Sequence, residues 1–267
     1  MECMQLSTSL IISTYNWPEA LSLCLESVLH QTVLPDEVII ADDGSRDDTR
    51  RLIEAFRQRC PVPLLHVWHE DDGFRKTQIM NQAFLQVSHP YIIQIDGDII
   101  LNRHFVEDHL RFAREGSFVT GSRVVIGKEL TQRLLRAHRW RFSLFTPGLH
   151  NRLNGLRLPF LTKSQENYRQ HDTLYVRGCN MAFWRKDIFA VNGYDEAITG
   201  WGREDNELAE RLINSGIRKR VIKFSAIAFH LYHEWRSRGS VERNDEILHS
   251  TMAQKRTRCE RGIDGHS

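Results

Sequence analysis

Short runs of apolar and β-branched residues in the first half of the chain predict strands separated by helices. The strand-like runs are Ser9–Ser13, Val38–Ala41, Leu64–Trp68, Tyr91–Ile95 and Phe118–Thr120. Between them, apolar residues recur at helical spacing in Pro18–His30, Asp47–Arg59 and Lys76–Val87. In the first helix we expect Asn16 as the cap and Pro18 at an early position. The alternation predicts an α/β fold with a mostly parallel central sheet flanked by helices.

Polar residues follow these strands where a parallel sheet opens its ligand crevice. The first strand is followed by Thr14-Tyr15-Asn16 and the second by Asp42-Asp43-Gly44-Ser45. The third precedes His69-Glu70-Asp71-Asp72-Gly73, and the fourth precedes Asp96-Gly97-Asp98. We therefore expect carboxylates and amides from several strand ends to meet at one edge of the sheet.

The Asp-x-Asp sequence at the end of the fourth strand is a candidate metal site. Asp96 and Asp98 are hard oxygen ligands that suit magnesium or manganese, and Gly97 allows the backbone to approach closely. Such a metal neutralises charge on a diphosphate leaving group. Turns also favour Asp and Gly for purely local reasons, so this motif needs the support of its neighbours.

Two further strand ends carry candidate nucleotide-binding residues. Asp43 can accept hydrogen bonds from a base or a ribose. The Asp71–Lys76 segment precedes a helix, where the positive helix end favours phosphate. Arg75 or Lys76 is a candidate phosphate contact, and a basic surface pair at a helix start is the alternative.

A tryptophan between two glycines stands out in the second half, in Gly200–Glu207, directly before the helical run Leu208–Asn214. Trp201 can lie flat against a sugar ring, while Glu204 and Asp205 can hold acceptor hydroxyls or remove a proton. An acidic first turn that stabilises its helix dipole explains the carboxylates equally well.

Histidines end an apolar run at Ala228–His233 and can complete a metal coordination shell. In an extended segment His230 and His233 point to opposite sides, so we expect at most one of them to reach the metal.

The segment Gly127–Lys163 is basic and aromatic, with a single acidic residue, Glu129. One interpretation is a helical insert whose apolar side packs on the core and whose basic face is solvated. The other is a contact with the acceptor or with an anionic membrane. The polar tail after Ser240 is expected to be helical in part.

Composition fits a globular protein, with 41% hydrophobic and 26% charged residues. The formal charge of +2 does not indicate nucleic acid as a partner. An odd number of scattered cysteines favours a reducing compartment over a disulfide framework. Met1–Gln5 lacks signal-peptide features, and no run reaches the roughly 18 apolar residues of a membrane span. We expect a cytoplasmic protein, or one held at the inner face of the plasma membrane.

These motifs together resemble glycosyltransferase family 2, whose members share the GT-A fold. The matching features are Ser13–Asn16, Asp42–Ser45 with Asp48-Thr49, and Asp96–Asp98. The second half is similar to the C-terminal part of beta-1,4-galactosyltransferases and to bacterial chondroitin-polymerase domains, through Arg177–Phe183 and Gly200–Asp205. The resemblance implies one GT-A domain over residues 1–240. Its nucleotide-binding half covers about 1–125, a basic insert 127–165 and an acceptor-binding half 170–240, followed by a tail at 241–267.

The resemblance also implies roles for particular residues. The nucleoside and donor contacts are Thr14, Tyr15, Asn16 and Asp43, with Asp72 close by. Asp96 and Asp98 hold the divalent metal and the donor diphosphate. His230, which follows an Ala-x-Ala-Phe run, matches the metal-binding histidine best, and His233 stays an alternative. Asp205 is the implied general base, and Glu204, Trp201 and Asn180 are the implied sugar contacts.

The predicted function is inverting, metal-dependent transfer of a sugar from a nucleotide-sugar, with UDP as the nucleotide implied by the resemblance. The acceptor is a glycan or glycolipid, as in the synthesis of lipopolysaccharide, capsule or another surface polysaccharide. One alternative is a sugar-phosphate nucleotidyltransferase, although Ser13–Trp17 lacks the glycine-rich basic loop of that class. Another is a non-catalytic nucleotide- or carbohydrate-binding protein, against which the Glu204-Asp205 pair argues.

Overall fold

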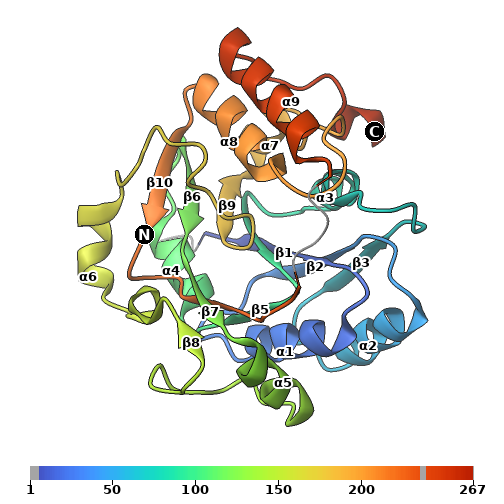
Figure 1. The fold of residues 1–267 in the computed structure, drawn as a ribbon, viewed down its shortest axis with the longest axis vertical. Coiled ribbons are helices and arrows are strands. Elements are labelled where there is room, and N and C mark those ends of the chain that lie inside the picture. The colour runs from blue at the N-terminus through green and yellow to red at the C-terminus, as the bar shows by residue number, and fades with distance from the viewer. Residues whose placement is uncertain (1–5, 235–238, 267) are drawn as a thin grey trace, which may run out of the picture.

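A seven-stranded sheet with the order β10-β6-β9-β4-β1-β2-β3 forms the centre of the molecule (Figure 1). The computed structural model describes residues 6–234 and 239–266. β1 pairs in parallel with β2 and β4, whereas β9 runs antiparallel to β4 and β6. The strands are β1 (Thr8–Thr14), β2 (Glu37–Asp42), β3 (Leu64–Trp68), β4 (Tyr91–Asp96), β6 (Ser117–Gly121), β9 (Met181–Trp184) and β10 (Arg218–Ile222). The predicted mostly parallel sheet is confirmed.

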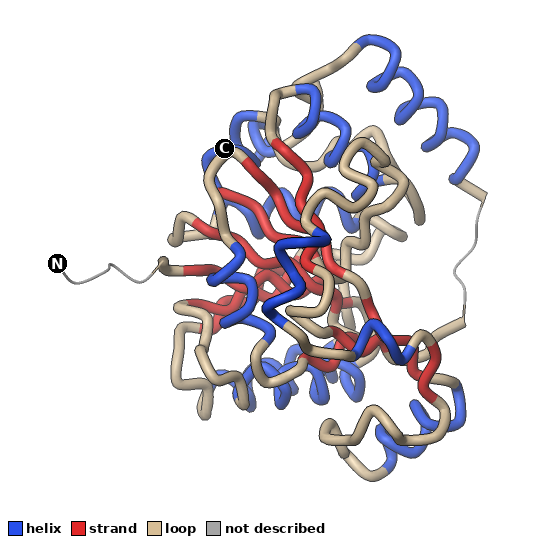
Figure 2. Tube along the Cα trace, turned by 90° about the vertical axis from the view of Figure 1, so that its left-hand side faces the viewer, coloured by secondary structure: helices blue, strands red, loops and turns tan. Residues whose placement is uncertain are grey.

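Helices cover both faces of this sheet, as Figure 2 shows from the side. α1 (Pro18–Leu29), α2 (Asp47–Arg57) and α4 (Phe105–Phe112) pack on one face, where Leu10 and Ile12 of β1 point. α3 (Lys76–Leu85), α7 (Arg185–Ala190) and α8 (Glu204–Asn214) cover the other face, which receives Ile11. Successive side chains of a strand point to opposite faces, so the continuous apolar runs read from the sequence correspond to strands buried on both sides.

A second, four-stranded sheet with the order β5-β11-β7-β8 was not predicted. Its strands are β5 (Ile99–Leu101), β11 (Ala228–His230), β7 (Arg123–Ile126) and β8 (Leu149–His150). They are too short for a clear periodicity, and their partners lie far apart in the sequence. α5 (Lys128–Arg136) packs Leu130 and Leu134 against this sheet, so the basic segment does bury an apolar side. Shorter helices follow at η1 (Arg152–Gly155), α6 (Pro159–Thr162) and η2 (Lys163–Gln165).

The predicted cap of the first helix is wrong. The helix begins at Pro18, as expected, but Trp17 occupies the cap position and makes no side-chain capping bond. Asn16 instead adopts a left-handed backbone with φ +47°, and its Oδ1 accepts a hydrogen bond of 2.9 Å from the Arg46 amide. Asn16 therefore joins the loop after β1 to the loop after β2.

The C-terminal segment forms α9 (Val241–Gln254), which packs against α8, and η3 (Ile263–His266), which packs near α3. The partly helical tail expected from the sequence is confirmed. Cys24, Cys60, Cys179 and Cys259 are free thiols. Among the described residues, no helix has the length and apolar character that crossing a membrane requires.

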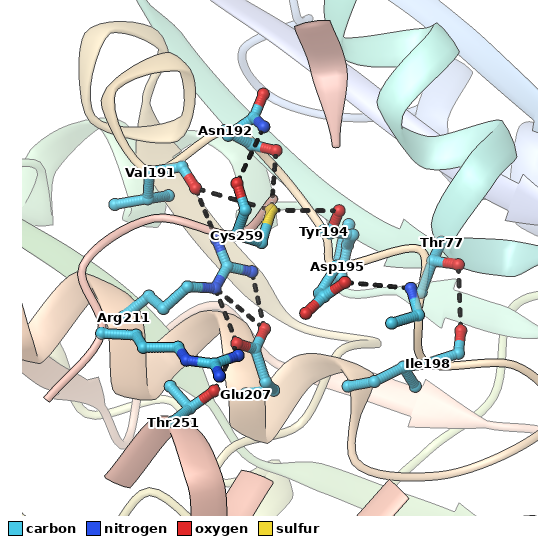
Figure 3. A network of polar contacts seen from close by, with 12 residues as sticks. Thr77, Val191, Asn192, Tyr194, Asp195, Ile198, Glu207, Arg211, Thr251 and Cys259 are labelled. Carbon is cyan, nitrogen blue, oxygen red and sulfur yellow. Dashed lines mark hydrogen bonds and ion pairs between the residues drawn. The ribbon is translucent and has the colours of Figure 1, made fainter. Parts of the chain in front are cut away.

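A buried ion pair fixes α8 to its surroundings (Figure 3). The Arg211 side chain is fully buried and bonds Glu207 at 2.6–2.9 Å and the Val191 carbonyl at 2.6 Å. Thr251 of α9 donates to the same Glu207 carboxylate at 3.0 Å. Because both charges are satisfied inside the protein, α7, α8 and α9 hold a defined relative position.

Replacing Arg211 with Met should lower the free energy of unfolding by about 3–5 kcal/mol, because Glu207 is left as an uncompensated buried charge. Urea denaturation followed by far-UV circular dichroism measures the loss. Arg50→Met is the matched control, since Arg50 pairs with Asp47 at 3.9 Å with both side chains largely exposed. A similar, small effect for both variants would show that the buried pair does not fix α8.

Candidate active site

The carboxyl ends of β1, β2 and β4 open into a cavity of about 590 Å³. Thr14, Tyr15, Asp43 and the segment 96–98 line it from the strand ends. The opposite wall comes from the second half of the chain, through residues between 174 and 179, residues 201–206, His233 and Val241. The predicted meeting of several strand ends at one edge of the sheet is therefore present in the structure.

One carboxylate and two imidazoles form a candidate metal centre beside this cavity. The ligating atoms of Asp98, His230 and His233 lie within 4.8 Å of one another. The Nε2 atoms of His230 and His233 are 3.5 and 3.4 Å from Oδ2 of Asp98. Oδ1 of Asp98 is buried and has no hydrogen-bond partner within the described chain. A mixed oxygen and nitrogen donor set fits a transition-metal ion such as manganese better than magnesium, which prefers oxygen ligands.

The expectation that at most one of the two histidines reaches this position is wrong. β11 ends at His230, so the alternation of an extended strand does not continue to His233. The Leu231 amide donates to the Asp98 carbonyl at 3.0 Å and holds the chain at this point. Both imidazoles therefore lie beside the same carboxylate.

Asp96, predicted as a metal ligand, lies outside this cluster. Its Oδ1 accepts hydrogen bonds of 2.7 Å from Ser13 Oγ and from Lys76 Nζ. Burial alone would raise the pKa of Asp96, but the Lys76 ammonium outweighs burial and lowers that pKa to about 2. Burial would likewise lower the pKa of Lys76, but Asp96, Asp205 and Glu204 outweigh burial and raise it. Lys76 faces the cavity as a cation paired with Asp96.

The Asp43 carboxylate is held at the cavity wall by two donors. His69 Nε2 lies 2.8 Å away, and the Arg75 amide donates at 3.1 Å. The Asp43 amide in turn donates to the Thr14 carbonyl at 3.0 Å. At Gly44, with φ +90°, a Cβ would lie 2.6 Å from the Asp71 backbone, so this turn requires glycine.

Three residues predicted to contact the donor do not line the cavity: Asn16, Asp72 and Arg75. The Asn16 side chain instead links the loop after β1 to the loop after β2. The Asp72 side chain is 82% exposed and lies 3.5 Å from the Arg75 guanidinium, which also donates to the Glu70 carbonyl. Arg75 presents its backbone amide to Asp43, and its guanidinium contacts Asp72 and the Glu70 carbonyl along the loop.

Glu204 and Asp205 begin α8 at the opposite wall. Burial, followed by the neighbouring Asp205, raises the pKa of Glu204 to about 7. Burial also raises the pKa of Asp205, while Lys76 opposes that rise. The raised pKa of Asp205 makes its carboxylate a better proton acceptor than an exposed aspartate.

Tyr194 and Gln94 hold the Asp205 carboxylate, and sequence reasoning missed both. The buried Tyr194 hydroxyl donates to Asp205 Oδ1 at 2.8 Å, and Gln94 Nε2 donates to that hydroxyl at 2.7 Å. A Cβ at Gly178 would lie 2.0 Å from Asp205 Oδ2, so only glycine allows this approach. Gly178 belongs to a motif recognised in the sequence, whereas Tyr194 carries no local signal of its role.

The loop before α8 presents Trp201 to the cavity through an unusual backbone. Gly200, Gly202 and Arg203 have φ values of +70°, +107° and +77°. Such left-handed positions are readily adopted by glycine and cost energy at Arg203, so surrounding contacts must maintain them. The two glycines beside Trp201 are explained by this backbone.

α9 supplies those contacts. The fully buried Asn244 donates from Nδ2 to the Gly202 carbonyl at 2.9 Å, and Asp245 pairs with Arg203. Val241, at the start of α9, lines the cavity. The segment 241–267 was expected to be a tail outside the domain, but its first turn belongs to the cavity wall.

Asn180, predicted as an acceptor contact, is fully buried away from the cavity lining. Its Nδ2 donates to the carbonyls of Ser122 and Ala226 at 3.1 and 3.0 Å. Its Oδ1 lies 3.0 Å from His109 Nε2. The amide connects segments next to both sheets, and it does not line the cavity where the acceptor contact was expected.

Comparison with known protein families agrees with this arrangement. The model described as glycosyl transferase family 2 matches residues 9–190, and that described as the N-terminal domain of galactosyltransferase matches residues 159–234. This chain belongs to glycosyl transferase family 2. The resemblance read from the motifs is confirmed, and glycosyl transfer is favoured over the nucleotidyltransferase and binding-protein alternatives.

Curated relatives of this glycosyltransferase include a glucosyltransferase and a chondroitin synthase. Validoxylamine A glucosyltransferase of Streptomyces hygroscopicus subsp. limoneus is 30% identical over 231 residues, covering 81% of this chain and 50% of the relative. Chondroitin synthase of Escherichia coli is 25% identical over 248 residues, covering 83% and 34% respectively. The chain thus spans half or less of the length of these relatives.

Solved structures confirm the GT-A fold of the glycosyltransferase. S. aureus TarS 1-349 in complex with UDP-GlcNAc aligns with a TM-score of 0.67 at 15% identity, over 97% of this chain and 69% of that one. The mannosyltransferase PcManGT from Pyrobaculum calidifontis, in complex with GDP-Man and Mn²⁺, aligns with a TM-score of 0.60 at 16% identity. That alignment covers 95% of this chain and 63% of the mannosyltransferase.

Removing the Tyr194 hydroxyl should impair the glycosyltransferase without unfolding it. The hydrogen bond from Tyr194 lowers the pKa of Asp205. With Asp205 as the proton acceptor that the resemblance implies, Tyr194→Phe should move the acid limb of the pH–rate profile to higher pH and lower the turnover at pH values on that limb. Any loss above the limb would report the orientation that this hydrogen bond, of about 1.5–3 kcal/mol, gives the carboxylate. Tyr91→Phe is the control, because the buried Tyr91 hydroxyl has no partner in the described chain. An unchanged profile would remove Tyr194 from this role.

Glu204 should make the stability of the glycosyltransferase depend on pH. Its folded-state pKa of about 7 lies above the ordinary value of 4.5, so the fold favours the protonated form. Its contribution to stability is complete below pH 4.5 and is lost as pH rises to about 7. The stability of Glu204→Gln relative to the native chain should therefore increase between pH 5 and about 7. Urea denaturation at several pH values tests this, and a constant difference would contradict it.

Proposed function

We propose that this enzyme transfers a sugar from a UDP-sugar to a hydroxyl group of a glycan or glycolipid, with inversion at the anomeric carbon. The observation that carries the proposal is one cavity lined by two chemically distinct groups. A carboxylate held by Tyr194 lines this cavity, and so do Asp98 and His233 of the candidate metal cluster. A proton acceptor and a leaving-group site that border the same cavity suit a single displacement.

Asp205 is the proposed general base. Its carboxylate accepts the proton of the acceptor hydroxyl as that oxygen forms a bond to the anomeric carbon. The bond from the anomeric carbon to the diphosphate oxygen breaks on the opposite face, and the nucleoside diphosphate leaves with the electron pair. An α-linked donor would therefore give a β-linked product. Glu204 and Trp201 line the same wall and are the proposed sugar contacts.

Asp98, His230 and His233 are the proposed ligands of manganese. The unpartnered Oδ1 of Asp98 and the two adjacent imidazoles fit such an ion. When bound, the ion supplies positive charge that stabilises the departing diphosphate. Lys76 and Arg123 line the cavity as well, and their side chains offer positive charge of the protein itself. Relatives in fold that are described with Mn²⁺ support the same assignment.

Thr14, Tyr15 and Asp43 are the proposed contacts of the nucleoside, because they line the cavity at the ends of β1 and β2. Support for a uridine nucleotide comes from TarS, described in complex with UDP and with UDP-GlcNAc. We place the reaction in the synthesis of lipopolysaccharide, capsule or another bacterial surface polysaccharide, on the cytoplasmic side of the membrane. A chondroitin synthase and a poly-beta-1,6-N-acetyl-D-glucosamine synthase among the relatives support this setting.

Two variants separate donor binding from catalysis. With MnCl₂ present, UDP should raise the melting temperature of the native chain more than GDP does, because a ligand of the folded state stabilises it. Asp98→Ala should lose the manganese-dependent part of this stabilisation. Asp205→Asn should keep it, but should release UDP from a UDP-sugar, with a panel of oligosaccharide acceptors, about 10²–10⁴-fold more slowly.

Asp72→Asn is the matched control, because this carboxylate is exposed and lies outside the cavity lining. Binding and turnover should both stay close to those of the native chain. Full turnover by Asp205→Asn would overturn its role as the base, and unchanged manganese dependence in Asp98→Ala would overturn the metal site. A retained anomeric configuration, read by NMR of the product, would overturn the single displacement.

A further inference from the structure

Large apolar side chains are unusually exposed in one part of the molecule. Phe145, Phe160 and Leu153 have exposed fractions of 87%, 78% and 76%. The other exposed large apolar residues of the described chain reach 54% at most. Single exposed apolar residues are ordinary on protein surfaces, but several that project strongly from one short segment indicate a binding surface.

The same segment carries positive charge without compensating acids. No Asp or Glu occurs between Glu129 and Glu166. The basic residues of this stretch are Arg133, Arg136, Arg139, Arg141, Arg152, Arg157 and Lys163. Arg157 pairs with Asp108 at 2.6 Å, but the other six have no carboxylate within 4.0 Å in the described part of the chain. Their charge is available to a partner.

Apolar and basic side chains are interleaved over this surface. Arg152 donates to the Thr146 carbonyl at 3.4 Å, which places it beside the loop of Phe145, and Leu153 follows directly. Lys163 is three residues after Phe160, on the same helical stretch, where residues at this spacing are neighbours. Figure 1 shows α6 at the left edge of the molecule, β8 and the loop before it at the lower left, and α5 along the lower edge. We call Phe145, Leu153, Phe160 and these six basic residues the basic-apolar surface.

We propose that the basic-apolar surface docks the protein on an anionic lipid bilayer. Phe145, Leu153 and Phe160 would enter the interface, and the surrounding cations would contact the lipid phosphates. An acidic polysaccharide would use the cations but offers no apolar interior for the three projecting side chains. A bilayer accommodates both properties, and each alone gives only weak membrane binding.

This inference goes beyond the proposed function, because lipid binding requires no sugar transfer. The surface is nevertheless connected to the candidate metal centre. His150 of β8 pairs with Val125 of β7, and Val125 pairs with His230 of β11 in the same small sheet. Docking would therefore hold the cavity close to the bilayer, where an amphiphilic acceptor would be found.

Vesicle co-sedimentation of the full chain, without nucleotide, tests the proposal. The native chain should pellet with vesicles of phosphatidylglycerol and phosphatidylcholine, should bind pure phosphatidylcholine poorly, and should be released by high salt. The triple variant Phe145→Ser/Leu153→Ser/Phe160→Ser should bind about tenfold more weakly. Arg136→Glu/Lys163→Glu should lose most of the preference for anionic lipid.

Leu65→Ser/Met252→Ser is the matched control, because these residues are also exposed, at 36% and 43%, but lie outside the surface. It should bind like the native chain. Circular dichroism and melting temperature verify that each variant is folded. Absence of binding by the native chain, or equal binding by the triple variant, would overturn the proposal. A native dimer that the triple substitution dissociates, without vesicle binding, would instead identify an interface between copies of this chain.

Discussion

The ion pair between Lys76 and Asp96 organises the candidate site. Several carboxylates share this cavity, and bringing like charges together out of water is unfavourable unless a cation lies among them. The Lys76 ammonium keeps Asp96 ionised and moderates the pKa rise of Asp205. Because α3 begins at Lys76 and packs Ile79 into the core, the position of this cation is set by apolar packing. Electrostatics and core packing are thus coupled at the start of one helix.

The part of the site formed by the strand ends could be predicted from the sequence, because the signals that mark those residues are local. Continuous apolar runs marked buried parallel strands, and the residues after them had to meet at one edge, where Asp43, Asp96 and Asp98 all line the cavity. The sequence did not show that Ser13 and Lys76 would bind the Asp96 carboxylate, which lies outside the metal cluster. The error at His233 has a local cause too, since β11 ends at His230 and the alternation of an extended strand no longer sets the direction of the His233 side chain. Asn180 was assigned to the acceptor because it lies in a matching motif, and a motif match does not say whether a side chain supports the fold or faces the ligand.

The cavity wall formed by the second half of the chain could be predicted less well, because its contacts join segments that are distant in the sequence. Tyr194 reaches Asp205 across a turn, and Gln94 reaches Tyr194 from a strand far earlier in the chain. The small sheet joins β5, β7, β8 and β11, which are short and separated by long stretches. Neither hydrophobic periodicity nor motif spacing records such pairings. The sequence likewise gives no sign that polar residues of α9, such as Asn244, are buried against the Trp201 loop.

The dependence of the Trp201 loop on α9 has a consequence for how the enzyme matures on the ribosome. The strand ends on the proposed donor side of the cavity all lie at or before Asp98, whereas Val241, Asn244 and Asp245 are synthesised much later. The left-handed backbone at Gly202 and Arg203 therefore gains its support long after the strand ends have been made. The order of synthesis separates the two halves of the site in time, because the Trp201 loop depends on α9.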